Sequence, residues 1–238
     1  MPRLLRALLA VVAAWLAATL VSVLVLRWLN PPFSAFMAET SLAAWLTRDP
    51  LYELRHRWAD LTQISPNLAL AVVASEDQKF PQHWGFDVEA IERAYQLNGH
   101  SHRVRGASTI SQQVAKNLFL WSGRSYLRKA LEAYFTVLIE GCWPKRRILE
   151  IYLNMAEFGY GTYGAEAASQ RFFHKSAGRL TRADAALLAA VLPNPQHYSA
   201  AAPSPFILRR RAWIMTQMQA LGGPEMLSEI DAYPDRRR

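Results

Sequence analysis

The sequence predicts a mainly α-helical domain preceded by one transmembrane helix. Three observations support this fold class. Residues 7–26 are twenty consecutive residues without a charge. Several later segments repeat apolar residues at the 3.6-residue spacing of a helix, and no long segment alternates apolar and polar residues as a half-buried strand does. The rest of the 238-residue chain has the length of one domain.

The uncharged run has the length of a membrane span. At ~1.5 Å per residue in a helix, it crosses the ~30 Å hydrocarbon layer of a bilayer. A cleaved signal peptide is the competing interpretation, but its apolar part would be shorter and would end in a small-residue cleavage site, which does not follow Leu26 cleanly. Arg3 and Arg6 precede the run, so the positive-inside rule predicts a cytoplasmic N-terminus with the remaining chain on the other side.

The chain is basic, with a formal net charge of +8. Such a charge suits nucleic acid, anionic lipid headgroups or a phosphorylated substrate, and the membrane anchor argues against nucleic acid. Cys142 is the one cysteine, so no disulfide can form within the chain. The sequence contains neither C-x-x-C nor H-E-x-x-H, so a zinc site is not predicted.

Residues 31–64 connect the anchor to the domain and are rich in aromatic residues and arginine. This mixture suits a segment at the membrane interface, although ordinary packing of a linker onto the domain explains it as well. After this junction, Ser65 and Pro66 have the residue types of an N-cap and a first helical position, which predicts a helix to about Ser75.

The next helices are predicted from similar signals. Asp87 is expected to cap a helix that runs to Leu97. The polar, basic segment 99–107 is expected to be a mobile loop, and Ser108 is expected to cap the helix after it. Further helices are predicted over residues 127–140, 145–158, 183–192 and 207–221, the third of them opened by the capping-box pair Thr181 and Asp184.

The segment from Ser75 to Asp87 carries the first candidate site. Glu76 and Asp77 directly follow the apolar run 68–74, which is expected to be buried. A carboxylate at the place where a buried helix gives way to a loop is partly desolvated, which raises its pKa and suits it to act as a general base. A solvated helix end is the alternative explanation of the same residues.

Two later helices carry candidate phosphate-binding side chains. Ser108, Gln112 and Lys116 lie at i, i+4 and i+8 and therefore share one helix face. A lysine beside amides on such a face can hold a phosphate, whereas most polar stripes on helices are simply solvated. Arg128 and Glu132 are i, i+4 neighbours with the cation first. This is the less favourable order for helix stability, so a functional role for Arg128 gains some support.

Five segments occur in an order and spacing that are more specific than any one of them alone. They are EDQKFPQHWGFD, GASTISQQVAKNLFL, RKALEAYFTVLIE, KRRILEIYLNMAEFGYGTYGAEAASQRFF and LTRADAALLAAVLPNP. Together they resemble the successive motifs of the peptidoglycan glycosyltransferases, which polymerise lipid II. The resemblance extends from about Leu68 to Pro205, with small departures at Ala107 and Ser111. Length and the single anchor resemble the monofunctional members, and the transpeptidase motifs S-x-x-K and K-T-G do not occur.

This resemblance implies a lysozyme-like, mostly helical fold with a small membrane-facing lobe. It assigns residues 1–30 to the cytoplasmic N-terminus and transmembrane anchor, 31–64 to a membrane-proximal junction, 65–225 to the glycosyltransferase domain and 226–238 to a C-terminal tail. It also implies a single-pass protein of the cell inner membrane with its catalytic domain in the periplasm.

The resemblance further implies an inverting transfer. Glu76 would deprotonate the 4-hydroxyl of an acceptor lipid II, which attacks the anomeric carbon of a lipid-linked donor to give a β-1,4 linkage and release undecaprenyl diphosphate. Lys116, Arg128 and Lys129 would neutralise the diphosphate, while Glu132 would orient these cations or hold a divalent cation such as Mg²⁺ or Mn²⁺. No organic cofactor is implied. The other residues implied at the substrate site are Asp77, Phe80, His83, Gly85, Ser108, Gln112 and Asn154.

The implied partners are lipid II, the growing lipid-linked glycan, membrane lipids and other proteins of cell-wall synthesis or division. Two further interpretations stand beside this one. A lytic enzyme of the lysozyme-like superfamily can also use one glutamate, but it has no need of a lysine–arginine cluster that receives a diphosphate. A non-catalytic membrane scaffold for cell-wall complexes predicts that Glu76 and Lys116 are replaceable.

Overall fold

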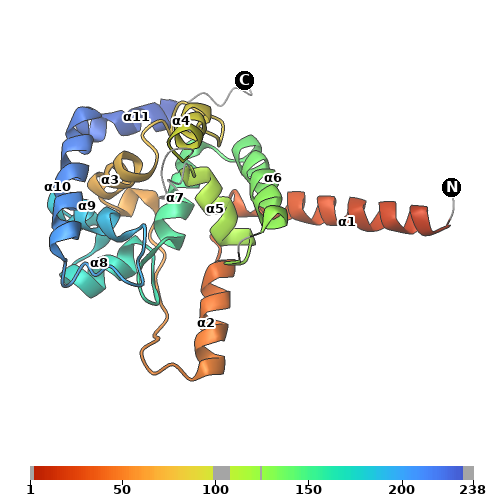
Figure 1. Ribbon diagram of the computed structural model, residues 1–238, viewed down its shortest axis with the longest axis horizontal. Coiled ribbons are helices and arrows are strands. Elements are labelled where there is room, and N and C mark those ends of the chain that lie inside the picture. Colours follow the sequence, from red (N-terminus) through yellow and green to blue (C-terminus); the bar gives the residue numbers. More distant parts are fainter. Residues whose placement is uncertain (1–2, 99–107, 124, 233–238) are drawn as a thin grey trace.

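The computed structural model describes residues 3–98, 108–123 and 125–232, so the loop expected over 99–107 lies outside it. The described chain is mainly helical, as predicted (Figure 1). The first helix extends away from a helical body, and the second projects from the body in another direction. The helices are α1 (Arg3–Leu26), α2 (Ala35–Thr47), α3 (Pro66–Glu76), α4 (Val88–Asn98), α5 (Ile110–Phe119), α6 (Tyr126–Cys142), α7 (Lys145–Met155), α8 (Ala165–Phe173), α9 (Arg182–Val191), α10 (Pro205–Ala220) and α11 (Leu227–Ala232), with 3₁₀ turns at Leu61–Gln63, Ala177–Arg179 and Gly223–Met226.

Several helices begin at the capping residues that the sequence indicated. The Ser65 hydroxyl accepts a hydrogen bond from the Asn67 N–H at the start of α3. Asp87 Oδ1 accepts one from the Ala90 N–H at 2.9 Å at the start of α4. The Thr181 side chain forms the expected capping box of α9. These predicted starts are confirmed.

Two predicted boundaries are wrong. The N-cap of α5 is Thr109 and not Ser108, because Thr109 and Gln112 form a capping box and Ser108 lies one residue outside it. α7 ends at Met155, earlier than the predicted end near residue 158, because strand β2 (Glu157–Gly159) follows it directly.

β-structure is minor, as predicted. Three short strands, β1 (Arg55–His56), β2 and β3 (Thr162–Tyr163), form a sheet in the order β1-β3-β2. β1 runs parallel to β3, and β2 runs antiparallel to it. Gly161 precedes β3 with a φ of +71°, and a Cβ there would lie 2.4 Å from the Glu53 carbonyl oxygen, so this turn requires glycine. The sheet thereby fixes the end of the junction to the chain after α7.

The apolar run 68–74 is buried along α3, as predicted. α3 packs against α9 and α10, and residues 185–191 of α9 are buried in turn. Helices that are apolar on all sides are stable only when other elements enclose them. Enclosure of α3 therefore holds its last residue, Glu76, in a defined place at the end of a rigid element.

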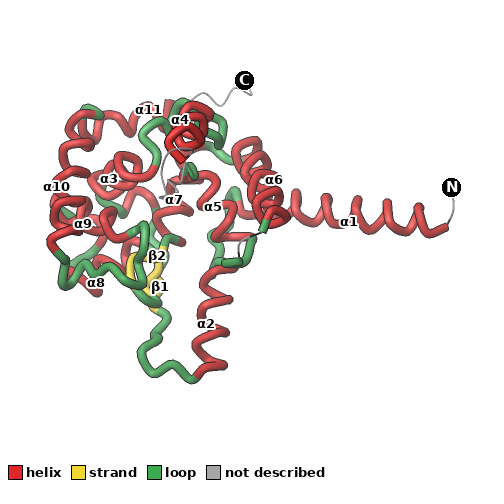
Figure 2. Tube along the Cα trace, in the orientation of Figure 1, coloured by secondary structure: helices red, strands yellow, loops and turns green. Residues whose placement is uncertain are grey.

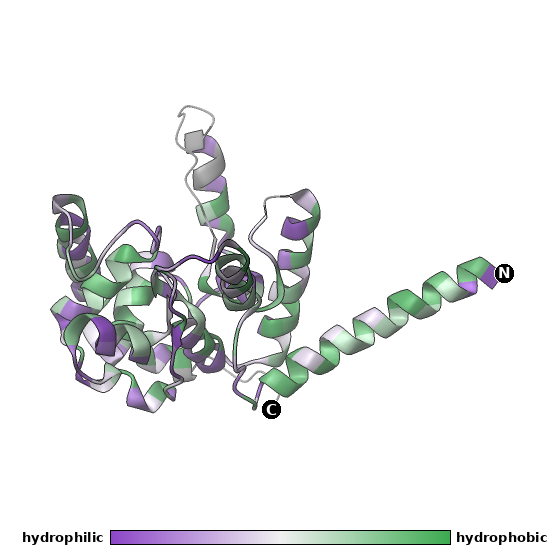
Figure 3. Ribbon diagram, turned by 90° about the horizontal axis from the view of Figure 1, so that it is seen from below, coloured by the Kyte–Doolittle hydropathy of each residue, from purple (hydrophilic) through white to green (hydrophobic). Residues whose placement is uncertain are grey.

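α1 is, among the described residues, the one helix long and apolar enough to cross a membrane, and Figure 3 shows its hydropathy. The C-terminal half of α1 lies against α6. Trp15 stacks on Tyr134 with 5.2 Å between ring centroids, and Thr19 Oγ1 lies 2.7 Å from the Tyr134 hydroxyl. The Trp143 indole N–H donates to the Val23 carbonyl at 2.7 Å. The anchor is therefore docked on the domain as well as connected to it.

Residues 35–54 form a limb that projects from the body and contains α2 (Figure 2). The far end of this α2 limb exposes large apolar side chains, with Trp45 74% and Leu46 66% accessible to solvent. Its near end packs on α5, where Lys116 Nζ lies 5.4 Å from the centre of the Phe36 ring. The sequence predicted no helix here, but its aromatic residues are those noted in the junction.

Candidate active site

Glu76 lies at the C-terminal end of α3 with 13% of its side chain exposed. Gln113 Nε2 of α5 donates to Glu76 Oε2 at 3.1 Å, and Arg210 Nη2 of α10 lies 3.5 Å from Glu76 Oε1. Burial raises the pKa of Glu76, and the adjacent Asp77 charge adds to this, while Gln113 and Arg210 partly oppose it. A carboxylate with a raised pKa is a better proton acceptor, which suits a general base.

Glu76 also reaches open space. It lines a cavity of about 260 Å³, together with side chains from the start of α4, the start of α5 and α10. Asp87, Ser108 and Trp213 are among the other lining residues. A hydroxyl group that entered this cavity could therefore approach the Glu76 carboxylate, which is the first geometric requirement for a base.

Asp77 is adjacent to Glu76 in sequence, but its carboxylate makes different contacts. Its side chain is buried, with His83 Nε2 at 2.9 Å from Oδ1 and the Ile110 N–H donating to Oδ2 at 2.9 Å. The carboxylate therefore sits at the N-terminus of α5, where unpaired N–H groups and the helix dipole favour a negative charge. Asp77 fixes the start of the helix that carries Gln113 and Lys116.

Phe80 and Gly85 lie behind the site rather than on its open face. Phe80 is fully buried. Gly85 has a φ of +77°, and a Cβ there would lie 2.6 Å from Thr136 Cγ2, so no larger residue fits. The Gly85 carbonyl accepts a hydrogen bond from the Thr109 hydroxyl at 2.6 Å. These residues hold α5 against α6, and with His83 they support Asp77.

The second part of the site is a cation cluster around Glu132 of α6, which is 3% exposed. Arg128 Nη1 lies 3.1 Å from Glu132 Oε2, and Lys129 Nζ pairs with the other oxygen. Arg128 Nε is buried without a hydrogen-bond partner in the described structure. A buried donor without a partner is costly, so an anion that bound here would gain a strong charge-assisted hydrogen bond.

Lys116 connects the two parts electrostatically. Burial lowers its pKa, the charges of Arg128 and Lys129 lower it further, and the charges of Glu132 and Glu76 oppose this. The lysine therefore interacts with both glutamates. Arg128, Lys129 and Glu132 thus lie together on α6, and Lys116 of α5 interacts electrostatically with them and with Glu76.

Gln112 and Asn154 are placed otherwise than expected for substrate ligands. Gln112 Oε1 accepts the Thr109 N–H at 3.0 Å and belongs to the cap of α5. Asn154 is fully buried, and its amide exchanges two hydrogen bonds of 2.9 Å with the backbone of Ala59. Both amides therefore stabilise the site's framework, and Asn154 offers no surface to a substrate in this conformation.

Three residues near Glu76 were not predicted from the sequence. Gln113 and Arg210 contact the carboxylate directly, and the Tyr152 hydroxyl donates to Gln113 Oε1 at 3.2 Å. Gln113 stands next to Gln112 in the same motif, and Arg210 belongs to the run Arg209–Arg211, which were the available signals. Neither signal relates α3 to α10.

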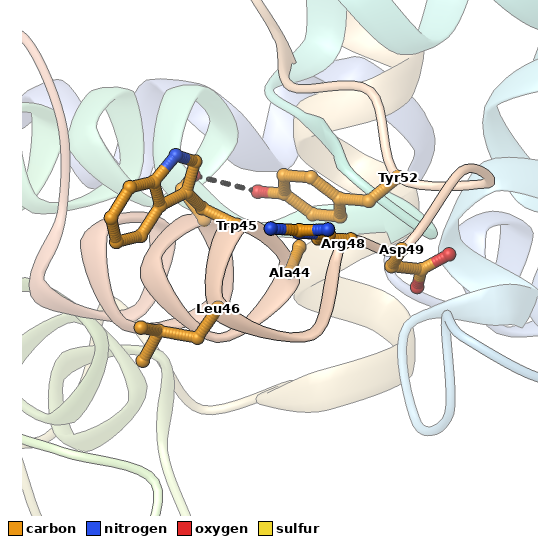
Figure 4. A pocket seen from close by; sticks show the side chains of 7 residues that line it. Ala44, Trp45, Leu46, Arg48, Asp49 and Tyr52 are labelled. Atoms are coloured by element: carbon orange, nitrogen blue, oxygen red, sulfur yellow. Dashed lines mark hydrogen bonds between the residues drawn. The ribbon is translucent and has the colours of Figure 1, made fainter.

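Another cavity, of about 550 Å³, lies in the α2 limb and not at Glu76 (Figure 4). The Ser41 and Tyr52 hydroxyls form a hydrogen bond of 2.8 Å beside it, and the Asp49 carboxylate accepts a hydrogen bond of 2.5 Å from the Tyr160 hydroxyl. The acidic group of this cavity is thus already bonded, and the lining includes no second carboxylate. Of these two cavities, the one at Glu76 therefore holds the carboxylate whose pKa is raised.

The residues around Glu132 do not fit a divalent cation held by the protein. Mg²⁺ prefers several oxygen ligands, and here the one carboxylate already bonds Arg128 and Lys129 through both oxygens. Across the described residues, no group of three or more His, Cys, Asp or Glu side chains could hold a metal. No chemical step is therefore assigned to a metal.

The sequence model of the transglycosylase family matches residues 43–219. This chain belongs to the transglycosylase family. The biosynthetic peptidoglycan transglycosylase of Cronobacter sakazakii is 53% identical over 225 residues, covering 94% of this chain and 92% of that protein. The protein of the same name from Klebsiella oxytoca is 62% identical over 193 residues, covering 81% and 80%. The one from Pseudomonas fluorescens is 50% identical over 228 residues, covering 96% and 95%.

These matches confirm the resemblance drawn from the five motifs. This member of the transglycosylase family is a peptidoglycan glycosyltransferase of cell-wall synthesis. Family membership therefore favours synthesis over both the lytic enzyme and the non-catalytic scaffold. The apolar helix α1 is consistent with a single-pass membrane anchor.

Proposed function

We propose that this transglycosylase polymerises lipid II, with Glu76 as the general base. The Glu76 carboxylate accepts the proton from the 4-hydroxyl of the acceptor sugar as that oxygen attacks the anomeric carbon of the lipid-linked donor. A positioned base of this kind contributes ~10²–10⁴-fold to the rate. The observation that carries the proposal is a mostly buried carboxylate of raised pKa that lines an open cavity.

The cation cluster receives the leaving group. As the bond between the anomeric carbon and the phosphate oxygen breaks, negative charge develops on the departing undecaprenyl diphosphate. Lys116, Arg128 and Lys129 stabilise this charge, which is most effective at partly buried positions. Glu132 holds Arg128 and Lys129 in place before the substrate arrives. One attack from the opposite face inverts the donor configuration and gives the β-1,4 linkage without a covalent enzyme intermediate.

The substrate tail requires this chemistry to occur at a membrane. We place the N-terminus in the cytoplasm, α1 across the inner membrane and the catalytic domain in the periplasm, since Arg3 and Arg6 lie at the N-terminal end of α1, before its uncharged run. The exposed apolar side chains of the α2 limb, including Trp45 and Leu46, suit contact with the lipid interface. This limb is the proposed membrane-facing lobe.

Incubation of the purified full chain with labelled lipid II tests the proposal. The parent protein is expected to give glycan polymer that a β-1,4-specific muramidase degrades, and Glu76→Gln is expected to give none above background. Glu53→Gln is a matched control, because Glu53 is exposed and pairs only with Arg55. Polymer from Glu76→Gln at the control rate would exclude Glu76 as the base. Release of fragments from finished glycan without polymer formation would support the lytic alternative.

A further inference from the structure

A buried hydrogen-bonded chain leads from α7 to Glu76. The Tyr152 hydroxyl donates to Gln113 Oε1 at 3.2 Å, and Gln113 Nε2 donates to Glu76 Oε2 at 3.1 Å. Tyr152 is 2% exposed. Neither Tyr152 nor Gln113 has a role in the transfer as proposed above, yet together they join three helices at the carboxylate.

The order of donors in this chain is set by the Glu76 carboxylate. A carboxamide donates from nitrogen and accepts at oxygen, so its two possible orientations present opposite groups to Glu76. Burial and the charges of Glu76 and Asp77 raise the pKa of Tyr152 well above its usual value, so the hydroxyl keeps its proton and remains a donor. A phenolic hydroxyl can donate or accept, whereas an ionised carboxylate only accepts, so Glu76 takes the amide N–H and the Gln113 oxygen is left to accept the Tyr152 proton.

We propose that Tyr152 and Gln113 are positioning residues for Glu76. Tyr152 stabilises this orientation of the Gln113 amide, and the amide binds Oε2, which leaves Oε1, with Arg210 at 3.5 Å, as the atom that receives the proton of the acceptor hydroxyl. This inference rests on the proposed function, in which Glu76 is the base. Neither positioning residue needs to touch the substrate.

Other charged groups also face Glu76, and the proposed role of Tyr152 and Gln113 does not alter them. Asp77 adjoins it, Lys116 interacts with it from α5, and Arg210 approaches Oε1 from α10 at 3.5 Å. The Gln113 contact favours the ionised carboxylate and lowers its pKa. If the amide turned its oxygen toward Glu76, the carboxylate would lose a donor and face a partial negative charge. The acidic limb of the pH profile would then move to higher pH.

The test is Tyr152→Phe in the full chain, which removes one hydroxyl from a buried ring. With lipid II as substrate, kcat is expected to fall up to about 10-fold, the upper range for loss of a hydrogen bond between neutral groups. KM is expected to stay within about two-fold, and the acidic limb is expected to shift to higher pH. Gln113→Leu should show the same shift, and the double variant should lose little more, because residues of one chain act as a unit.

Tyr163→Phe is the matched control, because Tyr163 is equally buried but lies on β3. It is expected to leave the pH profile unchanged whatever it does to stability. An unshifted acidic limb in Tyr152→Phe, or an equal shift in Tyr163→Phe, would overturn the inference. Glu76→Gln separates the two proposals. If it remains active the proposed function fails, whereas an inactive Glu76→Gln beside an unshifted Tyr152→Phe removes only the positioning role.

Discussion

Glu76 and Glu132 are two buried glutamates of one site in opposite surroundings. Glu76 has a neutral amide at 3.1 Å and one arginine at 3.5 Å. Glu132 bonds Arg128 and Lys129, one through each oxygen. Burial raises the pKa of Glu76, and Arg210 only partly opposes this, whereas Glu132 is paired with two cations. The same type of side chain is therefore suited to accept a proton at one position and to hold cations at the other.

Substitution of Glu76 is expected to have the largest effect. Glu76→Gln is expected to lower kcat ~10²–10⁴-fold. Its folded-state pKa is raised, so the stability this group contributes is present at low pH and lost as pH rises through the folded pKa. Gln is neutral throughout, so the variant should unfold at pH 7 at the same temperature as the parent or higher. Turnover of lipid II and thermal unfolding in detergent measure both effects; a lower unfolding temperature would contradict the assigned environment.

At the cation end, Lys116→Met should reduce kcat/KM for the lipid-linked donor about 10–100-fold, as expected for loss of a charged hydrogen bond of ~1.5–3 kcal/mol. Lys116→Arg is the control, because it keeps the positive charge and should retain more activity. Steady-state kinetics at several donor concentrations gives the comparison. Equal kcat/KM in the parent and Lys116→Met would remove this lysine from the diphosphate site.

Glu132→Gln should act mainly on stability and cation placement. Removing the carboxylate charge leaves Arg128 unpaired in a mostly buried position, which should cost ~1–3 kcal/mol after allowance for the exposed Lys129. Denaturant unfolding in detergent measures this loss. The fall in kcat should be smaller than for Glu76→Gln; the reverse order would mean that Glu132, and not Glu76, is the base.

The pH dependence of kcat should report the surroundings of Glu76. A base must be ionised, so activity is present above its folded-state pKa and falls as pH drops through that value. Because the pKa is raised, the acidic limb should have its midpoint above 4.5. Arg210→Met should move that limb further up by removing an opposing charge, while Arg210→Lys should move it less. A midpoint below 4.5 in the parent would contradict the desolvated setting.

The smallest expected effect concerns the start of α5, which carries groups to both glutamates. Thr109→Ala should cost about 1 kcal/mol because it removes the N-cap. Ser108→Ala should change stability by less than about 0.5 kcal/mol, as is usual for surface positions without such a bond. Unfolding of the two variants side by side checks the assignment. Equal losses would favour Ser108 as a second cap.

Local signals predicted the features that depend on neighbours in sequence. Ser65, Asp87 and Thr181 each marked a helix start because a cap acts within three residues. Arg128 and Glu132 were paired correctly because i and i+4 always meet on a helix. α2, α8 and α11 were not predicted. The exposed apolar end of α2 gives no amphipathic pattern, since its surroundings are not those of a soluble helix.

The placement of the substrate-site residues shows that local sequence signals do not predict the direction of a side chain. Asp77, Gln112 and Asn154 carry polar groups in the expected motifs, yet each is turned into the framework by a partner distant in sequence or by a cap. Composition could not distinguish a carboxylate that faces a cavity from one that begins a helix. Both carboxylates border the same cavity, and their hydrogen-bond partners separate Glu76 from Asp77.

By itself the sequence determined that this chain has one apolar helix long enough to cross a membrane, a helical domain, and acidic and basic side chains in the order of the transglycosylase motifs. These properties follow from composition, helical spacing and short-range hydrogen bonds. Tertiary structure alone decided that Arg210 and Gln113 meet Glu76, that Tyr152 stands behind Gln113 and that α1 docks on α6. Such contacts join segments far apart in the chain, and the packing of whole helices, rather than any local preference, brings them together.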